Sequence, residues 1–184
     1  ALVSALVLAP VQAGTTYQKD PASRIETWEA HEAGVSVRLT QIGPDQALAF
    51  FLGRGFPNQA AGRYAQECVF MTVIRNTGAA PLTYDLRTWR FVPAGDSARR
   101  MRVKEDWLEE WDLRGLSERA RIGFAWSQLP TTQEFEPGDW NQGMTTYAIA
   151  RGSRFDLVFE WKTGGKVFAG KLEGARCARS DEVR

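Results

Sequence analysis

The sequence has a single histidine, His31, and only two cysteines among its 184 residues. One imidazole excludes sites that need two or more histidine ligands, among them most zinc and histidine-rich copper centres. The 23 Lys and Arg residues nearly balance the 22 Asp and Glu residues, so the positive field that nucleic-acid binding requires is missing. No Gly-x-Ser-x-Gly elbow, Ser-x-x-Lys, His-Glu-x-x-His or P-loop motif occurs. These absences favour a protein without a cofactor, without a nucleic-acid partner and without catalytic activity.

Long apolar stretches are also missing, because none reaches the roughly 20 residues of a membrane-spanning helix. Residues 1–13, ALVSALVLAPVQA, carry no charge and place the small residues Val11 and Ala13 before Gly14. This pattern predicts the end of a signal peptide, cleaved after residue 13. The alternative is an apolar strand or helix of the mature fold. We expect residues 14–184 to form one domain that is periplasmic or secreted and has no transmembrane segment after cleavage.

The two cysteines, Cys68 and Cys177, form an even pair, and export would place them in an oxidising compartment. A disulfide between them is therefore expected, with two free buried thiols as the alternative. Neither belongs to a Cys-x-x-Cys pair, so redox catalysis is not indicated.

Hydrophobic periodicity predicts a mainly β protein, with about eight strands between closely spaced turn signals. The expected strands are residues 35–40, 47–52, 69–74, 82–91, 122–126, 144–149, 154–162 and 166–172, the last two forming a hairpin with its turn at 163–165. Short amphipathic helices are expected at 60–68 and 104–113 as insertions. No internal repeat is evident. The pattern is typical of an antiparallel sandwich or barrel.

Residues 69–84, VFMTVIRNTGAAPLTY, resemble a recurrent hairpin of exported bacterial immunoglobulin-like sandwiches. There an apolar strand runs into an Asn-x-Gly turn and a Pro-Leu strand start. The Pro-Gly corner in residues 135–139, FEPGD, is similar to the one that precedes a late strand in such domains. The likeness covers about 20 residues and implies an immunoglobulin-like β-sandwich, in which the two helices expected from the spacing would be insertions. It implies no particular function, because fold does not determine function.

Seven tryptophans are the most unusual feature of the composition. Trp126 and Trp161 stand in phase with apolar neighbours, and we expect them in the core. Trp107, Trp111 and Trp140 stand in polar or charged surroundings, so they are candidates for an aromatic platform that binds a sugar ring or a partner's side chain. The alternative for Trp107 and Trp111 is burial, since they are four residues apart on a helix.

The loop GDWNQGM, residues 138–144, adds Asp139 and Asn141 as candidate contacts beside Trp140. Their oxygens could serve Ca²⁺, but two ligands are far fewer than the roughly six to eight that the ion requires. A turn held by the Asp139 side chain explains the same residues.

The function we expect is a non-catalytic accessory or binding domain that presents tryptophan-bearing loops to a protein or glycan partner in the cell envelope. One alternative is copper binding or metal transfer by Met71, Met144 and His31, because Cu(I) prefers soft donors. That alternative requires the scattered ligands to meet near the surface. Another is a carbohydrate-active enzyme, which would require two carboxylates converging in a cleft.

Overall fold

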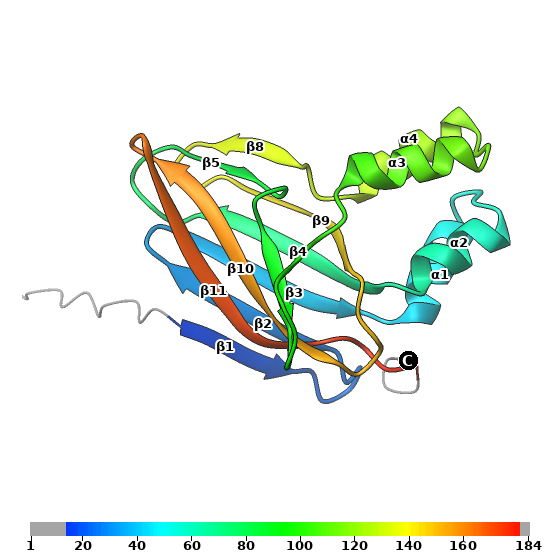
Figure 1. The fold of residues 1–184 in the computed structure, drawn as a ribbon, viewed down its shortest axis with the longest axis horizontal. Helices are drawn as coiled ribbons and strands as arrows, with labels where there is room; N and C mark the ends of the chain where they lie inside the picture. Colours follow the sequence, from blue (N-terminus) through cyan, green and yellow to red (C-terminus); the bar gives the residue numbers. More distant parts are fainter. Residues whose placement is uncertain (1–13, 181–184) are drawn as a thin grey trace, which may run out of the picture.

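The structure, a computed structural model, describes residues 14–180, in which two antiparallel sheets share an apolar core and four helices gather at one end (Figure 1). The first sheet has the order β1-β2-β3-β4-β9: β1 (Gly14–Lys19), β2 (Glu26–Glu32), β3 (Val35–Ile42), β4 (Cys68–Asn76) and β9 (Trp140–Tyr147). The second has the order β7-β6-β10-β5-β8, with β11 also paired to β10: β5 (Leu82–Asp85), β6 (Arg90–Pro93), β7 (Arg99–Arg100), β8 (Thr132–Phe135), β10 (Arg154–Thr163) and β11 (Lys166–Arg176). The helices are α1 (Pro44–Leu52), α2 (Asn58–Ala65), α3 (Lys104–Leu113) and α4 (Glu118–Ser127).

This arrangement confirms the expected mainly β class with antiparallel pairing. The signal peptide expected at residues 1–13 lies outside the described residues.

The core between the sheets is built from side chains that alternate along the strands. In β10 the buried members of the alternation are Phe155, Leu157, Phe159 and Trp161. They share one cluster with residues of the first sheet, such as Val37 of β3. The expected hairpin of β10 and β11 is confirmed, and β11 continues to Arg176.

Residues 47–52, which we expected to form a strand, belong to helix α1 instead. Pro44 stands at the start of the helix, where its missing N–H leaves no hydrogen bond unmade. The side chain of Gln46 accepts the Gly43 N–H at 2.9 Å, which fixes the first turn. Ala47 and Phe51, four residues apart, are the buried positions. A short unbroken apolar run is compatible with a buried strand or a helix, and here the helical spacing decides.

Residues 122–126 were also expected to form a strand, and they lie in helix α4. The Ser117 side chain accepts the Ala120 N–H at 3.3 Å and caps the helix. Ala120 and Phe124, four residues apart, are its buried residues, while Ile122 is exposed. The apparent alternation therefore does not mark one buried face.

The hairpin of β1 and β2 has no counterpart among the expected strands. Its first strand is an edge strand with the polar sequence GTTYQK and is almost wholly exposed, so it carries no hydrophobic alternation. Its second strand does bury Trp28 and Ala30 against the core.

The two helical hairpins, α1–α2 and α3–α4, repeat each other at an offset of 60 residues. Residues 41–60 and 101–120 agree in burial class at every position. Both first helices start with the same device, a third-residue side chain that accepts the backbone N–H preceding the helix, from Gly43 to Gln46 and from Val103 to Asp106. The expectation of no internal repeat is therefore wrong for the structure.

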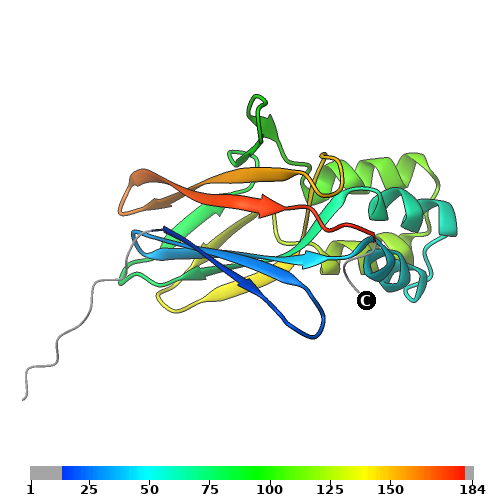
Figure 2. The ribbon, with the colours of Figure 1, turned by 90° about the horizontal axis from the view of Figure 1, so that it is seen from below.

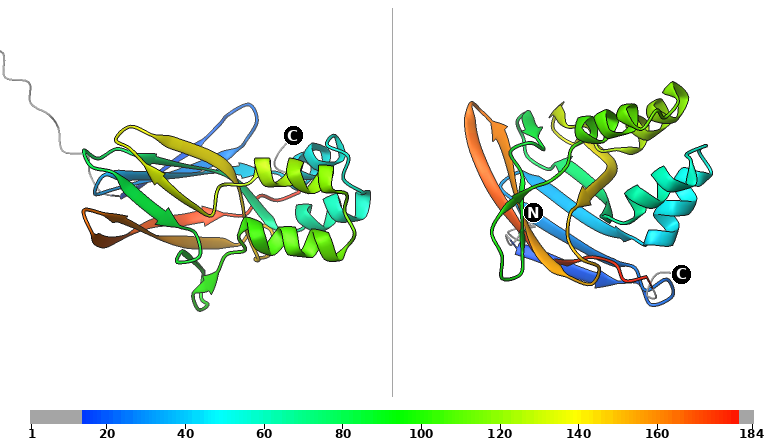
Figure 3. Two further views of the ribbon diagram at one scale, coloured as in Figure 1. Left: turned by 90° about the horizontal axis from the view of Figure 1, so that it is seen from above. Right: turned by 45° about the vertical axis from the view of Figure 1, so that its right-hand side comes forward.

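The repeated hairpins pack against each other through a shared aromatic cluster, with all four helices at the same end of the sheets (Figures 2 and 3). Tyr64 and Phe124, which occupy equivalent positions in the repeat, are in contact at 5.4 Å between ring centroids. Phe51 contacts Phe124 at 5.6 Å and Tyr64 contacts Trp107 at 5.0 Å. Because each contact joins one hairpin to the other, neither buries its aromatic face alone.

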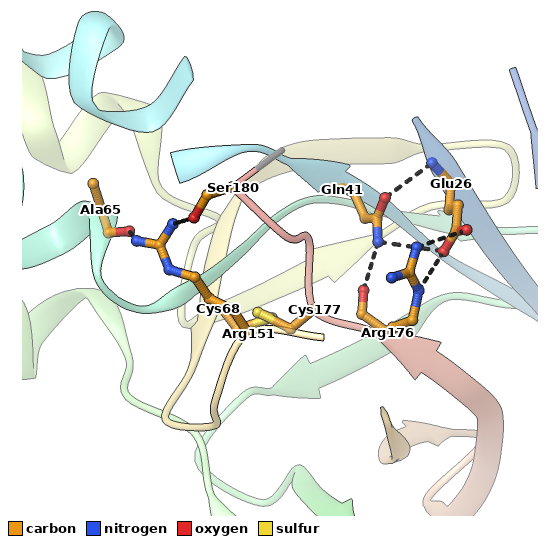
Figure 4. The surroundings of a disulfide bond; sticks show 8 residues. All are labelled: Glu26, Gln41, Ala65, Cys68, Arg151, Arg176, Cys177 and Ser180. Atoms are coloured by element: carbon orange, nitrogen blue, oxygen red, sulfur yellow. Dashed lines mark hydrogen bonds and ion pairs between the residues drawn. A yellow bond between two sulfur atoms is a disulfide. The ribbon is translucent and has the colours of Figure 1, made fainter. Parts of the chain in front are cut away.

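A disulfide joins Cys68, the first residue of β4, to Cys177, just after β11, with a Cα–Cα distance of 5.3 Å (Figure 4). The expected pairing is confirmed. Beside it, the Arg176 guanidinium donates to the buried Glu26 carboxylate at 3.0 Å. Gln41 accepts the Glu26 N–H and donates to the Arg176 carbonyl. These bonds tie the end of β11 to three strands of the first sheet.

Candidate binding surface

Trp107 and Trp111 do not form a surface platform, because both are buried, with exposures of 1% and 0%. Their rings stack with centroids 5.1 Å apart on the inner face of α3. The Trp107 Nε1–H donates to the Thr146 hydroxyl at 3.0 Å, and the Arg102 guanidinium lies 3.8 Å from a Trp107 ring centroid. The four-residue spacing of Trp107 and Trp111 thus reflects their burial between the hairpins. The prediction that they belong to an exposed platform is wrong.

Trp126, which we expected in the core, is 87% exposed. In a strand, residues two apart point to the same side, so Trp126 would follow Phe124 inward. In a helix they lie roughly 200° apart around the axis, which turns Trp126 away from the buried Phe124. A helical interpretation from the Ser117 cap and the spacing of Ala120 and Phe124 would have found this exposure.

Trp140, at the start of β9, is 51% exposed, as its polar surroundings suggested. The Arg75 guanidinium of the neighbouring strand β4 lies 5.8 Å from its ring centroid. That distance allows a cation–π contact that helps to orient the ring.

Asp139 and Asn141, the other two candidates in this loop, are engaged within the protein. The Asp139 carboxylate accepts the Glu136 N–H at 2.9 Å, the turn that we gave as its alternative role. The Asn141 amide donates to Gln133 of β8 at 2.7 Å and accepts the Gln142 N–H at 2.7 Å. Both residues therefore shape the loop.

A groove of about 310 Å³ lies between the end of α4 and the edge strand β9. Its lining residues are Lys104, Ala125, Trp126, Gln128, Pro130, Asn141 and Gln142. The groove brings Trp126 to the loop that carries Trp140, although the two tryptophans come from different elements. Gln142 and Trp140 are two residues apart on one strand, so their side chains point to the same face.

Gln142 thus shares the groove with Trp126 and a strand face with Trp140, and we call these three residues the tryptophan surface. The Gln142 side chain makes no hydrogen bond within the described part of the chain. Its donor and acceptor are both open to an incoming molecule.

The repeat supplies an internal comparison for this surface. Trp126 corresponds to Gln66 of the first hairpin, which is also exposed. The exposed Leu113 and Ile122 likewise correspond to Gly53 and Gly62. Since both hairpins share the same backbone plan, folding does not require an apolar side chain at these positions.

Two of the three candidate copper ligands come together. Met71 and Met144 face each other across β4 and β9, and Met144 is buried while Met71 is partly buried under the helices. His31 stands elsewhere, opposite Ser36 in the sheet, with its imidazole 3.6 Å from the Glu29 carboxylate. Among residues 14–180, no group of three or more His, Cys, Asp or Glu side chains could hold a metal ion.

The carboxyl groups with clearly shifted pKa values are all shifted downward: Asp20, Glu26, Asp96, Glu110 and Asp156. At Glu110, burial would raise the pKa, but the hydrogen bond from Arg102 and the charge of Arg63 outweigh it. Such shifts characterise carboxylates that are hydrogen-bonded or ion-paired in their charged form, whereas a general acid at neutral pH needs a raised pKa.

In comparisons with known proteins, no family model, no curated protein and no solved structure matches this chain. Within residues 14–180, no helix combines the length and the apolar character needed to cross a membrane.

Proposed function

We propose that this chain is an exported, non-catalytic binding domain that presents the tryptophan surface to a protein or glycan partner of the cell envelope. The observation that carries the proposal is the 87% exposure of Trp126 at a position where the first hairpin has Gln66. An indole that stays in water contributes no burial free energy to folding. A partner that covers it would gain the free energy of burying its large apolar area. Exposed aromatic side chains beside a groove are typical of binding sites.

Export is supported by two independent features. The disulfide between Cys68 and Cys177 is of the kind that persists in oxidising compartments. Residues 1–13 also have the apolar, uncharged pattern of a signal peptide. We propose a periplasmic or secreted location. The two antiparallel sheets are compatible with an immunoglobulin-like sandwich, the finer fold class that we propose.

The proposal is tested by immobilising the purified chain and passing over it cell-envelope fractions from the organism in which the protein naturally occurs. We expect the wild type to retain a component that the double variant Trp126→Gln, Trp140→Gln does not retain. Leu113→Ser removes an exposed apolar side chain outside the groove and should retain it normally. Equal retention by the double variant, or none by the wild type, would overturn the proposal.

The pairing of Met71 with Met144 favours copper binding as a second candidate, because it places two thioethers side by side. Titration of the purified chain with Ag(I), a stand-in for Cu(I), is the test. Binding at a one-to-one ratio that Met144→Leu abolishes would support this candidate. An unchanged titration in that variant would dismiss it.

A further inference from the structure

We infer that the tryptophan surface takes an extended, uncharged oligosaccharide, with one sugar ring against each indole and the Gln142 amide between them. This inference rests on the proposed function and names the ligand class of the same site. Its basis is the order of the three side chains, their hydrogen-bonding state and the charge of the groove.

The position of Gln142 relates the two tryptophans to each other. Trp140 and Gln142 share one face of β9, roughly 6.8 Å apart along the strand, a distance comparable with the length of one sugar residue in a chain. Gln142 in turn lines the groove that Trp126 also lines. An elongated ligand that lies across Gln142 would therefore reach both indoles, whereas a single sugar ring would occupy only one.

The tryptophan surface alternates apolar and polar groups, as a sugar chain does. A pyranose ring presents C–H groups on its face and hydroxyl groups around its rim. The exposed indoles suit the face, and the Gln142 amide offers the hydroxyl groups a free donor and a free acceptor. A protein partner that covers both indoles would also remove water from the Gln142 amide between them. This desolvation costs free energy unless the partner supplies a polar group that hydrogen-bonds to the amide.

The remaining amides of the groove are already held in place. The Gln128 side chain accepts the Tyr64 hydroxyl at 3.0 Å, and Asn141 is bonded to Gln133. These bonds fix the groove walls before any ligand arrives, so less order has to be gained on binding.

The charge of the groove fits a neutral ligand. Lys104 is the one ionisable residue among those that line it, and its ammonium lies 3.9 Å from the Glu105 carboxylate. An anionic polymer would call for several cations. The lining also contains no carboxylate, and glycoside hydrolysis requires a pair of them. The arrangement therefore serves binding without cleavage.

The test is calorimetric titration of the purified chain with three neutral hexaoses, chitohexaose, cellohexaose and maltohexaose, each compared with its monosaccharide. We expect at least one hexaose to bind, and to bind more tightly than its monosaccharide because it engages both rings. Trp126→Gln and Trp140→Gln should each weaken it about tenfold. Leu113→Ser is the matched control and should bind like the wild type, with circular dichroism confirming that every variant is folded.

Gln142→Leu separates the two classes of partner. It keeps the size of the side chain but removes the amide, so oligosaccharide affinity should fall, while docking of an apolar protein surface should be unchanged or stronger. Failure of all three hexaoses, or equal binding of hexaose and monosaccharide, overturns the inference. If an envelope component is retained through the two tryptophans but is lost after protease treatment and not after periodate oxidation, the proposed function stands and the sugar inference falls.

Discussion

Gly55 and Gly115 occupy the same place in the two helical hairpins, and both adopt the left-handed backbone conformation, with φ of +81° and +69°. Each lies between the first and second helix of its hairpin. In both turns the residue after the glycine donates its N–H to the carbonyl of the last buried aromatic residue of the first helix. The two hydrogen bonds run from Phe56 to Phe51 and from Leu116 to Trp111. The turn geometry is therefore part of what the repeat preserves.

Gly55→Ala and Gly115→Ala should each lower the free energy of unfolding by about 1–2 kcal/mol, because a Cβ disfavours positive φ. Gly62→Ala is the control, since Gly62 lies in helix α2 with open space where a Cβ would stand. That variant should be more stable by about 0.5–1 kcal/mol. Urea unfolding followed by circular dichroism measures all three. Equal effects at positions 55 and 62 would contradict the role of the turn.

Substitution of tryptophans should separate the buried from the exposed. Trp111→Ala should cost about 3–5 kcal/mol of unfolding free energy, because Trp111 is fully buried between the hairpins. Trp126→Gln should change it by no more than about 0.5 kcal/mol, because its side chain is almost wholly in water. Urea unfolding provides the comparison. A large loss of stability in Trp126→Gln would mean that Trp126 supports the fold and would undermine the proposed binding role.

The strands that were predictable are those whose buried residues alternate, such as β10 and β3. Helices α1 and α4 were interpreted as strands, because a short apolar run and a brief alternation are compatible with a strand or a helix. Only the capping residues and the four-residue spacing distinguish the two. In α4 the exposure of Trp126 depended on that choice, so the more exposed of the two indoles in the tryptophan surface was missed. The exposure of Trp140 was predictable from its polar neighbours, but the loop that they indicated is wrong at this residue, because Trp140 begins strand β9.

The repeat was hidden because few of its positions keep the same residue. The identical pairs between residues 43–66 and 103–126 are Leu48 and Leu108, Arg54 and Arg114, Gly55 and Gly115, Ala60 and Ala120, and Ala65 and Ala125. Up to residues 60 and 120, size and polarity differ elsewhere while the burial class is kept, as where Ala47 corresponds to Trp107. Packing of the two hairpins against each other allows a small residue on one side to be matched by a large one on the other.

Removing the disulfide should destabilise the protein substantially. The bond closes a segment with a sequence separation of 109 residues, for which loop entropy predicts about 4–5 kcal/mol. The double variant Cys68→Ala, Cys177→Ala and the reduced wild type should lose similar amounts in urea unfolding. Dithiothreitol should lower the stability of the wild type alone. An unchanged wild type under reducing conditions would show that the hydrogen bonds around Arg176 suffice to hold the C-terminal segment.

The stability of the protein should depend on pH through Glu26. Burial by itself would raise the pKa of this carboxyl group, but the hydrogen bond and the charge of Arg176 outweigh it and hold the pKa below the ordinary 4.5. A lowered pKa in the folded state means that the stabilisation is complete above the unfolded-state pKa and is lost as the pH falls through the folded-state pKa. Glu26→Gln should therefore lower the free energy of unfolding by about 1–3 kcal/mol at pH 7, because it removes the negative charge that strengthens the hydrogen bond from Arg176.

That difference should shrink as the pH falls below the ordinary pKa of 4.5, and it should go on shrinking until the pH has passed the lowered folded-state pKa of Glu26. Urea midpoints of the two proteins between pH 7 and pH 3 measure it. Glu109→Gln, on the exposed face of α3, is the control and should follow the wild type throughout. A gap between wild type and Glu26→Gln that is the same at pH 3 and pH 7 would contradict the assignment, because the loss would then come from packing and not from the charge of the carboxylate.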